Sequence, residues 1–287
     1  MPWYLFAMSG VVVNALSHVI RRKVMTKTHK LDYYTSAYLF SFANSIILFI
    51  YAVFAGFTMP PIGSMFWVFV INIVLGLVGW LVNNKALSLL PLGEYSVLMT
   101  SRQFITWLTS ILFLGIGLSA LQGVGSAIII AGILIVYLHK SAWKGNNAKG
   151  VGFTLLTALI YGTAILTDQI IYRSSDPASF LLIGFIVNTI LLATLRPSVV
   201  TKTKLLVSKQ WSLMLIGFGV LSSASLVLMF TSLKLADNAP LVSAVFQLQT
   251  IASVVFGIIL LKETKHLAYK LIGASVATLG TILVIVG

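Results

Sequence analysis

Arg102 is the residue of this sequence that most needs a chemical explanation. It lies near the middle of a long apolar segment, residues 91–114. If that segment crosses a membrane, a guanidinium at its centre costs at least ~2.5–3.5 kcal/mol and stays charged. Arg102 therefore needs a water-filled cavity, a carboxylate or an anionic solute beside it. Glu94 is the structural alternative as an ion-pair partner, but the two positions differ by ~12 Å of helix rise and about 80° of rotation.

Glu94 itself has two interpretations. It lies shortly after Pro91, in the first turn of the expected helix, where a carboxylate interacts favourably with the helix dipole. Alternatively, it is a carboxylate at the mouth of a cavity that couples solute movement to protons or cations. Tyr95 and Trp107, which lie on either side of Arg102 along the chain, are expected to shape a pocket around it.

Gln247 and Gln249 lie at mid-depth of a second apolar segment, residues 239–261. An amide side chain in a membrane helix needs a partner outside its own helix. The pair therefore either lines a cavity or bonds between helices. Tyr161 is a further pocket candidate, and other segments carry the amides Asn44, Asn83, Asn84 and Asn188.

Asn14 and His18 share one face of the first apolar segment, residues 3–21, because residues four apart are neighbours on a helix. Asn14 is a candidate for solute binding. A histidine side chain ordinarily titrates near neutral pH, so His18 is a candidate proton relay or gate, although its position near the polar end of the segment also fits the membrane interface. The tryptophans Trp67, Trp80, Trp143 and Trp211 are interpreted as belt residues at the interfaces.

Ten apolar segments must position these residues. Most are long enough to cross a ~30 Å hydrocarbon core as a helix with a rise of ~1.5 Å per residue. None shows the sustained alternation of a transmembrane β-strand. The expected fold is therefore an all-α integral membrane protein with ten transmembrane helices, over residues 3–21, 33–57, 65–84, 91–114, 119–138, 150–172, 178–195, 211–233, 239–261 and 266–286.

Composition excludes a soluble protein. Hydrophobic residues make up 59% of the 287 residues, charged residues only 9%, and the mean hydropathy is +1.02. A soluble domain carries roughly 25% charged residues. No basic region precedes the first apolar segment, so that segment is expected to be a permanent span. The net charge of +13 is attributed to cytoplasmic loops, and nucleic acid is not an expected partner.

No catalytic or metal-binding pattern is present in the sequence. The four histidines are scattered, and the chain contains no cysteine. The sequence also lacks a nucleophile elbow, a P-loop and a clustered pair of carboxylates. We therefore expect no enzyme activity, no catalytic residues, no metal and no cofactor. ATP-driven movement of a solute by this chain alone is disfavoured.

The sequence repeats itself, with expected repeats at residues 1–145 and 146–287. Lys85 precedes Pro91 by the same spacing as Lys234 precedes Pro240. The last segment of each half carries a glycine pair, Gly125 with Gly132 and Gly273 with Gly280. Small residues on one helix face let another helix approach closely. Because each half has five spans, the second half should be inverted relative to the first.

The residues that repeat also carry a family resemblance. Ala86-Leu87 precedes Pro91, and Leu235-Ala236 precedes Pro240. With the glycine helices, this pattern resembles the drug/metabolite transporter superfamily, in its ten-helix EamA-type branch, over essentially the whole chain. Leu261-Lys262-Glu263-Thr264 is similar to the Glu-containing turn before the family's last helix, whereas Leu114-Gly115-Ile116-Gly117 in the first half has no acid. The resemblance implies a transporter and leaves the solute open.

Loop charges predict the orientation. The odd-numbered connections hold 16 of the 19 Lys and Arg residues, the even-numbered ones hold Arg173 and Lys234, and Arg102 completes the set. The positive-inside rule then places both termini outside the cell. Ten-helix relatives are commonly drawn with both termini in the cytoplasm.

The functional hypothesis is a secondary transporter in the cell (plasma) membrane, an exporter or exchanger of a small polar metabolite working by alternating access. An amino acid or organic anion is the favoured solute, protons are a candidate coupling ion, and a monomer or homodimer is expected. Cationic-drug export is less attractive, because the first helix offers Asn14 and no membrane-embedded carboxylate. The alternatives are a lipid-linked sugar flippase and a non-transporting scaffold, in which Arg102 would be paired internally without a wet cavity.

Overall fold

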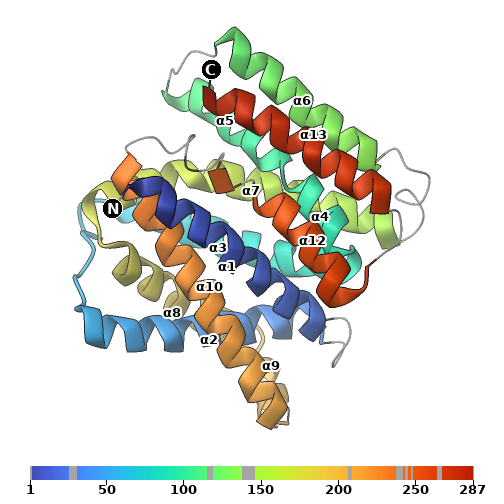
Figure 1. Cartoon of the computed structure of the whole chain (residues 1–287). Helices are drawn as coiled ribbons and strands as arrows, with labels where there is room; N and C mark the ends of the chain where they lie inside the picture. The colour runs from blue at the N-terminus through green and yellow to red at the C-terminus, as the bar shows by residue number, and fades with distance from the viewer. Residues whose placement is uncertain are drawn as a thin grey trace.

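A computed structural model describes residues 2–25, 31–114, 119–137, 146–205, 209–236, 242, 245–246, 248–263 and 267–286, and the described residues contain helices and no strands (Figure 1). The helices are α1 (Trp3–Lys23), α2 (Tyr33–Ala55), α3 (Phe66–Leu89), α4 (Leu92–Leu98), α5 (Ser101–Leu114), α6 (Ala120–Tyr137), α7 (Asn146–Ser174), α8 (Pro177–Leu195), α9 (Ser198–Leu205), α10 (Lys209–Ala236), α12 (Gln249–Leu261) and α13 (Leu267–Val286).

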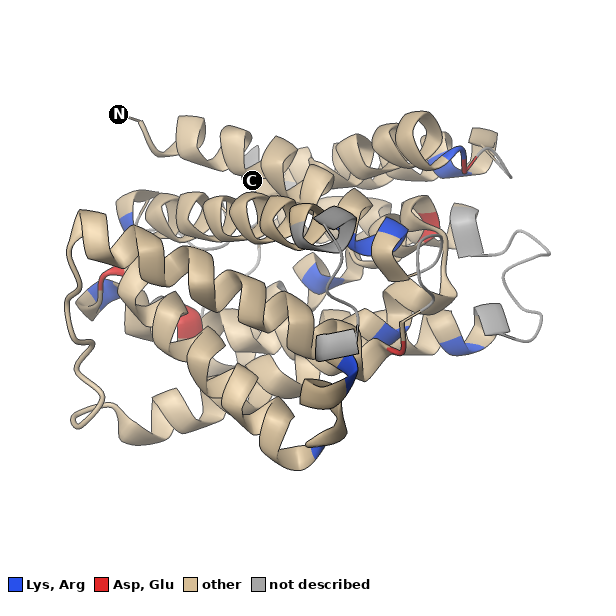
Figure 2. Cartoon of the chain, turned by 90° about the horizontal axis from the view of Figure 1, so that it is seen from below, with Lys and Arg blue, Asp and Glu red and all other residues tan. Residues whose placement is uncertain are grey.

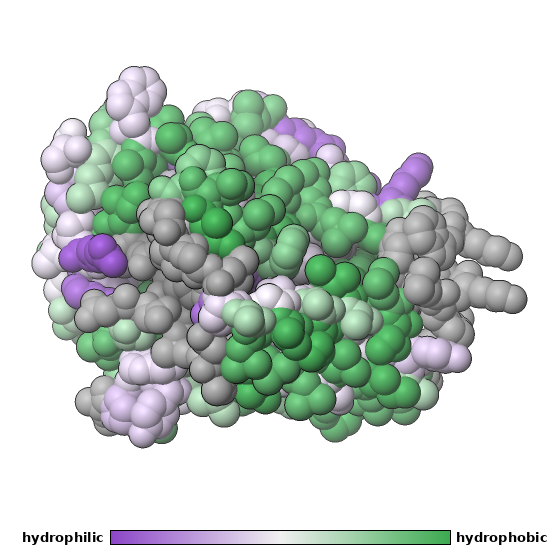
Figure 3. Space-filling model, turned by 90° about the horizontal axis from the view of Figure 1, so that it is seen from above, coloured by the Kyte–Doolittle hydropathy of each residue, from purple (hydrophilic) through white to green (hydrophobic). Residues whose placement is uncertain are grey.

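Six of the described helices, α1, α2, α3, α7, α8 and α10, have segments long and apolar enough to cross a membrane, and α6, α12 and α13 contain shorter apolar stretches. The space-filling view shows a wide apolar surface, with hydrophilic residues mainly toward its two sides (Figure 3). This distribution is what a bilayer requires of a multi-pass membrane protein. The all-helical prediction is confirmed, and the number of ten transmembrane helices stays a prediction.

The main helix contacts between the two halves have counterparts when every helix is replaced by its equivalent in the other repeat. α3 packs along α7, and its counterpart pair α10 and α1 packs in the same way, while α2 pairs with α8 and α6 with α13. A Cβ added to Gly132 would lie 2.6 Å from the backbone N of Ala277, and one added to Gly280 would lie 2.7 Å from that of Ile129. The two glycine stripes thus face each other, and α6 runs antiparallel to α13. This is the relation that inverted repeats require.

The predicted span 91–114 is not one helix, which corrects the sequence interpretation. α4 ends at Leu98 and α5 begins at Ser101. The Thr100 hydroxyl donates to the Val97 carbonyl at 2.6 Å, and the Ser101 hydroxyl donates to the Leu98 carbonyl at 2.7 Å. These short-range bonds satisfy carbonyls that a continuous helix would use for backbone N–H groups, so they favour a break. Arg102 therefore lies in the first turn of α5, directly after the break.

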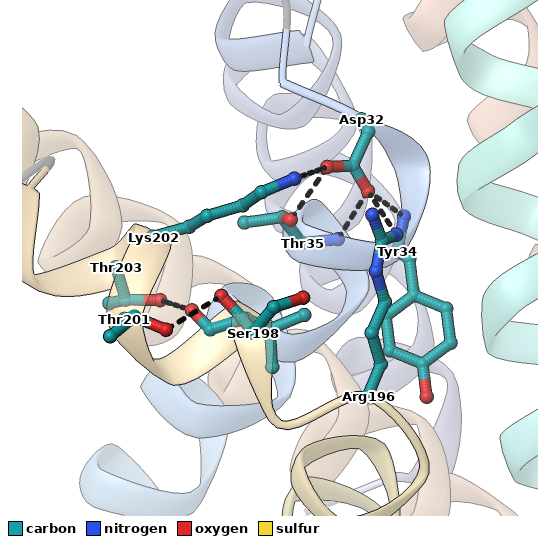
Figure 4. Close-up of polar contacts among 9 residues, drawn as sticks. Asp32, Tyr34, Thr35, Arg196, Ser198, Thr201, Lys202 and Thr203 are labelled. Carbon is teal, nitrogen blue, oxygen red and sulfur yellow. Dashed lines mark hydrogen bonds and ion pairs between the residues drawn. The ribbon is translucent and has the colours of Figure 1, made fainter.

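Lys and Arg residues gather toward one end of the bundle (Figure 2). At that end Asp32 caps α2 by accepting hydrogen bonds from the backbone N of Tyr34 and of Thr35, at 3.1 and 3.0 Å. Its carboxylate also pairs with Arg196 at 3.2 Å and with Lys202 at 3.4 Å (Figure 4). The connection after α8 forms the short helix α9 and is tied to α2 by these pairs.

Two basic residues that were assigned to connections lie inside the bundle instead. Arg21 is 2% exposed and precedes the end of α1 at Lys23. Lys270 is 2% exposed, lies in α13, and pairs with Glu94 of α4 at 3.8 Å. Arg21 is the last residue of the predicted segment 3–21, and α1 continues past it to Lys23, while Lys270 lies in the first turn of α13. Both cations are therefore buried on helices rather than held in loops.

Candidate functional site

A cavity of about 230 Å³ lies between the two halves of the chain. Side chains from α1, α3, α4, α5, α7, α8, α10 and α12 line it, so both repeats contribute. Six residues singled out from the sequence meet there: Asn14, His18, Tyr95, Arg102, Tyr161 and Gln249. They come from both halves of the chain.

Arg21 lies at the side of the cavity nearest the basic end of the bundle. Its Nε donates to Oδ1 of Asn84 at 2.9 Å, and its guanidinium carbon lies 4.2 Å from the centre of the Trp80 ring. A guanidinium over an aromatic face is stabilised by the ring quadrupole. Its Nη2 atom is buried and has no hydrogen-bond partner among the described residues. Arg21 is thus held by neutral groups and keeps its positive charge for the cavity.

Arg102 and Asp168 bring opposite charges to the same space. Both line the cavity, yet their charged atoms do not approach within the 4.0 Å limit of an ion pair. The Nε of Arg102 is buried with no hydrogen-bond partner in the described part of the chain. Asp168 accepts a hydrogen bond at 2.7 Å from Nδ2 of Asn72. A solute can therefore lie between a cation and a carboxylate that remain separate.

Hydroxyl and amide groups connect the walls of the cavity. The Tyr95 hydroxyl donates to Oδ1 of Asn83 at 2.6 Å, and Nδ2 of Asn83 donates to the Tyr161 hydroxyl at 3.4 Å. Nδ2 of Asn14 donates to Oε1 of Gln249, which joins α1 to the first turn of α12. This last contact is the interhelical bond that was one of the two alternatives for a glutamine at this position, and Gln249 lines the cavity as well.

Aromatic rings line the opposite side of the cavity, where α7, α8 and α10 meet. Tyr172 stacks on Phe230 with 4.1 Å between ring centroids, and it meets Phe180 edge-on at 5.1 Å. Phe180 also contacts Phe69 at 5.6 Å between centroids. The hydroxyl of Tyr172 is buried without a hydrogen-bond partner among the described residues. The cavity thus has a cationic side near Arg21 and an aromatic side near Tyr172.

Three of the predicted site residues are not placed in the cavity. Glu94 lies outside its lining and pairs with Lys270 across the two halves, so a coupling role at the cavity mouth has no geometric support. Gln247 lies outside the described residues, and the side chain of Trp107 is not among the described ones. The substrate-binding roles of Asn14, Tyr95, Arg102, Tyr161 and Gln249 and the coupling role of His18 stay predictions.

Sequence reasoning missed two charged residues of the site. Arg21 was counted among the loop charges because the predicted span stopped there. Asp168 lies within the predicted span 150–172 and was not considered as a site residue; a scan for ionisable residues inside spans would have found it. Trp80 is also corrected: its Nε1 donates to the Ala37 carbonyl at 2.9 Å and its side chain lines the cavity, so it is not a belt residue.

Comparisons with known proteins agree with this architecture. The sequence profile of the EamA-like transporter family matches residues 1–138 and again residues 148–286. A crystal structure of a protein with 11% sequence identity superposes with a TM-score of 0.69, covering 99% of this chain and 96% of the other. At that identity the likeness concerns the fold alone. No curated protein sequence gives a significant match.

Proposed function

Because the chain belongs to the EamA-like transporter family, we propose that it is a secondary transporter that moves a small polar metabolite by alternating access between its two halves. The family supports a membrane transporter of small solutes. An amino acid or organic anion is the solute class that the cavity favours. The proposal places the protein in the cell membrane as an exporter or exchanger, with no catalytic role.

The observation that carries the proposal is the pair of cavity guanidiniums with unpartnered nitrogens. Arg21 and Arg102 each keep a buried nitrogen without a hydrogen-bond partner in the described residues. An unsatisfied buried donor on a charged group is costly, and a carboxylate or phosphate satisfies such donors well. The cavity of about 230 Å³ is small beside the ~300–1,000 Å³ pockets that hold drug-sized ligands. A small anionic or zwitterionic metabolite therefore fits better than a drug or a lipid-linked sugar.

Two structural features argue against the alternative of a non-transporting scaffold. A scaffold would pair Arg102 internally and would have no central cavity. Arg102 has no ion-pair partner within 4.0 Å in the part of the chain that is described, and the cavity lies between the halves. For coupling, we favour Asp168 and His18 over Glu94 as proton-binding candidates, since both line the cavity.

Counterflow in liposomes tests the proposal. Purified wild type and Arg102→Gln would be reconstituted at equal density and assayed with a radiolabelled panel of amino acids and organic anions. Wild type should exchange at least one solute of the panel, and Arg102→Gln should lose most of that exchange. Arg173→Gln is the matched control, because Arg173 is exposed at the end of α7, and it should retain exchange. A wild type that moves no solute of the panel, or an Arg102→Gln that matches wild type, would overturn the proposal.

A further inference from the structure

The charges of the cavity form an unequal set. Of the described residues that line it, the Lys, Arg, Asp and Glu side chains are Arg21, Arg102 and Asp168, two cations and one carboxylate. No pair among the three forms an ion pair within 4.0 Å. The site therefore carries a net positive charge in a low-dielectric setting, which favours a solute with a net negative charge.

Unpartnered atoms of both hydrogen-bonding kinds line the same cavity. The donors are Nη2 of Arg21 and Nε of Arg102. On the acceptor side, Oδ1 of Asn188 is buried without a partner in the described residues, and so is the hydroxyl of Tyr172. The carboxylate of Asp168 lies on the same helix as Tyr172, α7, one turn before it. Because buried polar groups are normally satisfied, the solute should carry both strong acceptors and a strong donor.

The three charges are not equivalent in position. Arg102 and Asp168 act on each other electrostatically, whereas Arg21 lies toward the basic end of α1. Tyr161 and all three charged residues line the same cavity. A group with adjacent positive and negative charges suits the gap between Arg102 and Asp168. A second negative group of the same solute suits Arg21.

We propose that the site selects acidic α-amino acids, with the α-carboxylate at Arg102, the α-ammonium at Asp168 and the side-chain carboxylate at Arg21. The inference rests on the proposed function, because it names the solute class of that same cavity. Two carboxylates and one ammonium neutralise the two guanidiniums and the one carboxylate of the site. A neutral amino acid leaves Arg21 unpaired, and a dicarboxylate without an amine leaves Asp168 unpaired.

Counterflow with radiolabelled L-glutamate, L-glutamine and glutarate separates these cases. Glutamine keeps the size of glutamate and lacks the second negative charge, while glutarate keeps both carboxylates and lacks the ammonium. Wild type should exchange glutamate and L-aspartate at least about tenfold faster than glutamine and glutarate at equal low concentration, since each leaves one buried charge unpaired.

Arg21→Gln gives a signature that misfolding cannot imitate. This variant should lose glutamate exchange and gain glutamine exchange, because the substituted amide pairs with an amide and leaves no unpaired charge. Asp168→Asn should lose the preference for glutamate over glutarate. Arg173→Gln, exposed on the same helix as Asp168, should keep the wild-type order of solutes.

The outcomes distinguish failure of the acidic selectivity from failure of the transporter proposal. Exchange of glutamine or other neutral amino acids in preference to glutamate would overturn the acidic selectivity and leave the transporter proposal standing. An unchanged order of solutes in both Arg21→Gln and Asp168→Asn would also overturn the selectivity. Absence of exchange for every amino acid and organic anion would overturn the transporter proposal, and the selectivity with it.

Discussion

Glu263, just after the end of α12, accepts a hydrogen bond at 2.7 Å from the backbone N of Leu92, the first residue of α4. The same carboxylate pairs with Nε of Arg22 at 3.4 Å. One side chain therefore caps a helix of the first half and holds the end of α1. This gives a physical reason for the Glu-containing turn that the resemblance pointed to: a carboxylate at a helix N-terminus satisfies an orphan N–H and complements the helix dipole.

Glu263→Ala should lower the stability of the protein by at least about 1 kcal/mol, because the cap of α4 and the partner of Arg22 are lost together. Thermal melting in detergent measures the effect as a lower midpoint. Glu263→Gln is the control, since it keeps an oxygen acceptor for the N–H of Leu92. Its melting midpoint should lie between those of wild type and Glu263→Ala. Equal midpoints for wild type and Glu263→Ala would show that the cap contributes nothing.

Gly132→Ala should destabilise the contact between α6 and α13. A Cβ at Gly132 would lie 2.6 Å from the backbone N of Ala277 and 2.7 Å from the carbonyl of Gly273. Backbone atoms cannot move aside as a flexible side chain can, so the helices must separate at a cost of about 1–3 kcal/mol. Detergent melting again gives the readout.

Gly123→Ala is the control for that substitution on the same helix. A Cβ at Gly123 meets nothing within 4 Å, and alanine raises helix propensity by about 1 kcal/mol relative to glycine. This variant should melt at or above the wild-type midpoint. Equal melting midpoints for Gly132→Ala and Gly123→Ala would contradict the close contact between α6 and α13 at the two glycine stripes.

The sequence allowed the bundle, its duplication and its inversion to be predicted, because hydropathy and glycine spacing are properties of single helices. It did not allow the break between α4 and α5 to be predicted, since the hydroxyl bonds of Thr100 and Ser101 depend on local backbone geometry. Six cavity residues were found because polar groups in apolar segments are costly. Arg21 was missed, since its burial depends on the neutral partners Asn84 and Trp80 from another helix.

Asp32→Asn should lower stability at neutral pH and lose that effect in acid. Partial burial raises the pKa of Asp32, but hydrogen bonds from Thr35 and the charges of Arg196 and Lys202 outweigh it and hold the pKa below its usual value. A carboxyl with a lowered pKa in the folded state stabilises above its unfolded pKa, ~3.9, and this stabilisation is lost as the pH falls below that value. Exposed ion pairs contribute about 0.2–1 kcal/mol each, so the effect is small.

Melting midpoints at pH 7 and pH 3 measure the difference between wild type and Asp32→Asn. The difference should shrink on acidification. Asp176→Asn is the control, because Asp176 caps α8 through the backbone N of Ser179 at 2.9 Å, and among the described residues no Lys or Arg pairs with it within 4.0 Å. Asparagine caps a helix about as well as aspartate. A constant difference across pH would contradict the role of the Asp32 charge.

The orientation of the protein can be tested by labelling, since the chain contains no cysteine. Ser64 lies in the connection between α2 and α3, and Ser198 begins α9 at the basic end; both are exposed. Serine and cysteine are nearly isosteric, so Ser64→Cys and Ser198→Cys form a matched pair. The positive-inside rule places the basic end in the cytoplasm. A membrane-impermeant maleimide added to intact cells should therefore label Ser64→Cys, and Ser198→Cys only after permeabilisation. The reverse pattern would place both termini in the cytoplasm and show that the loop charges misassign the orientation.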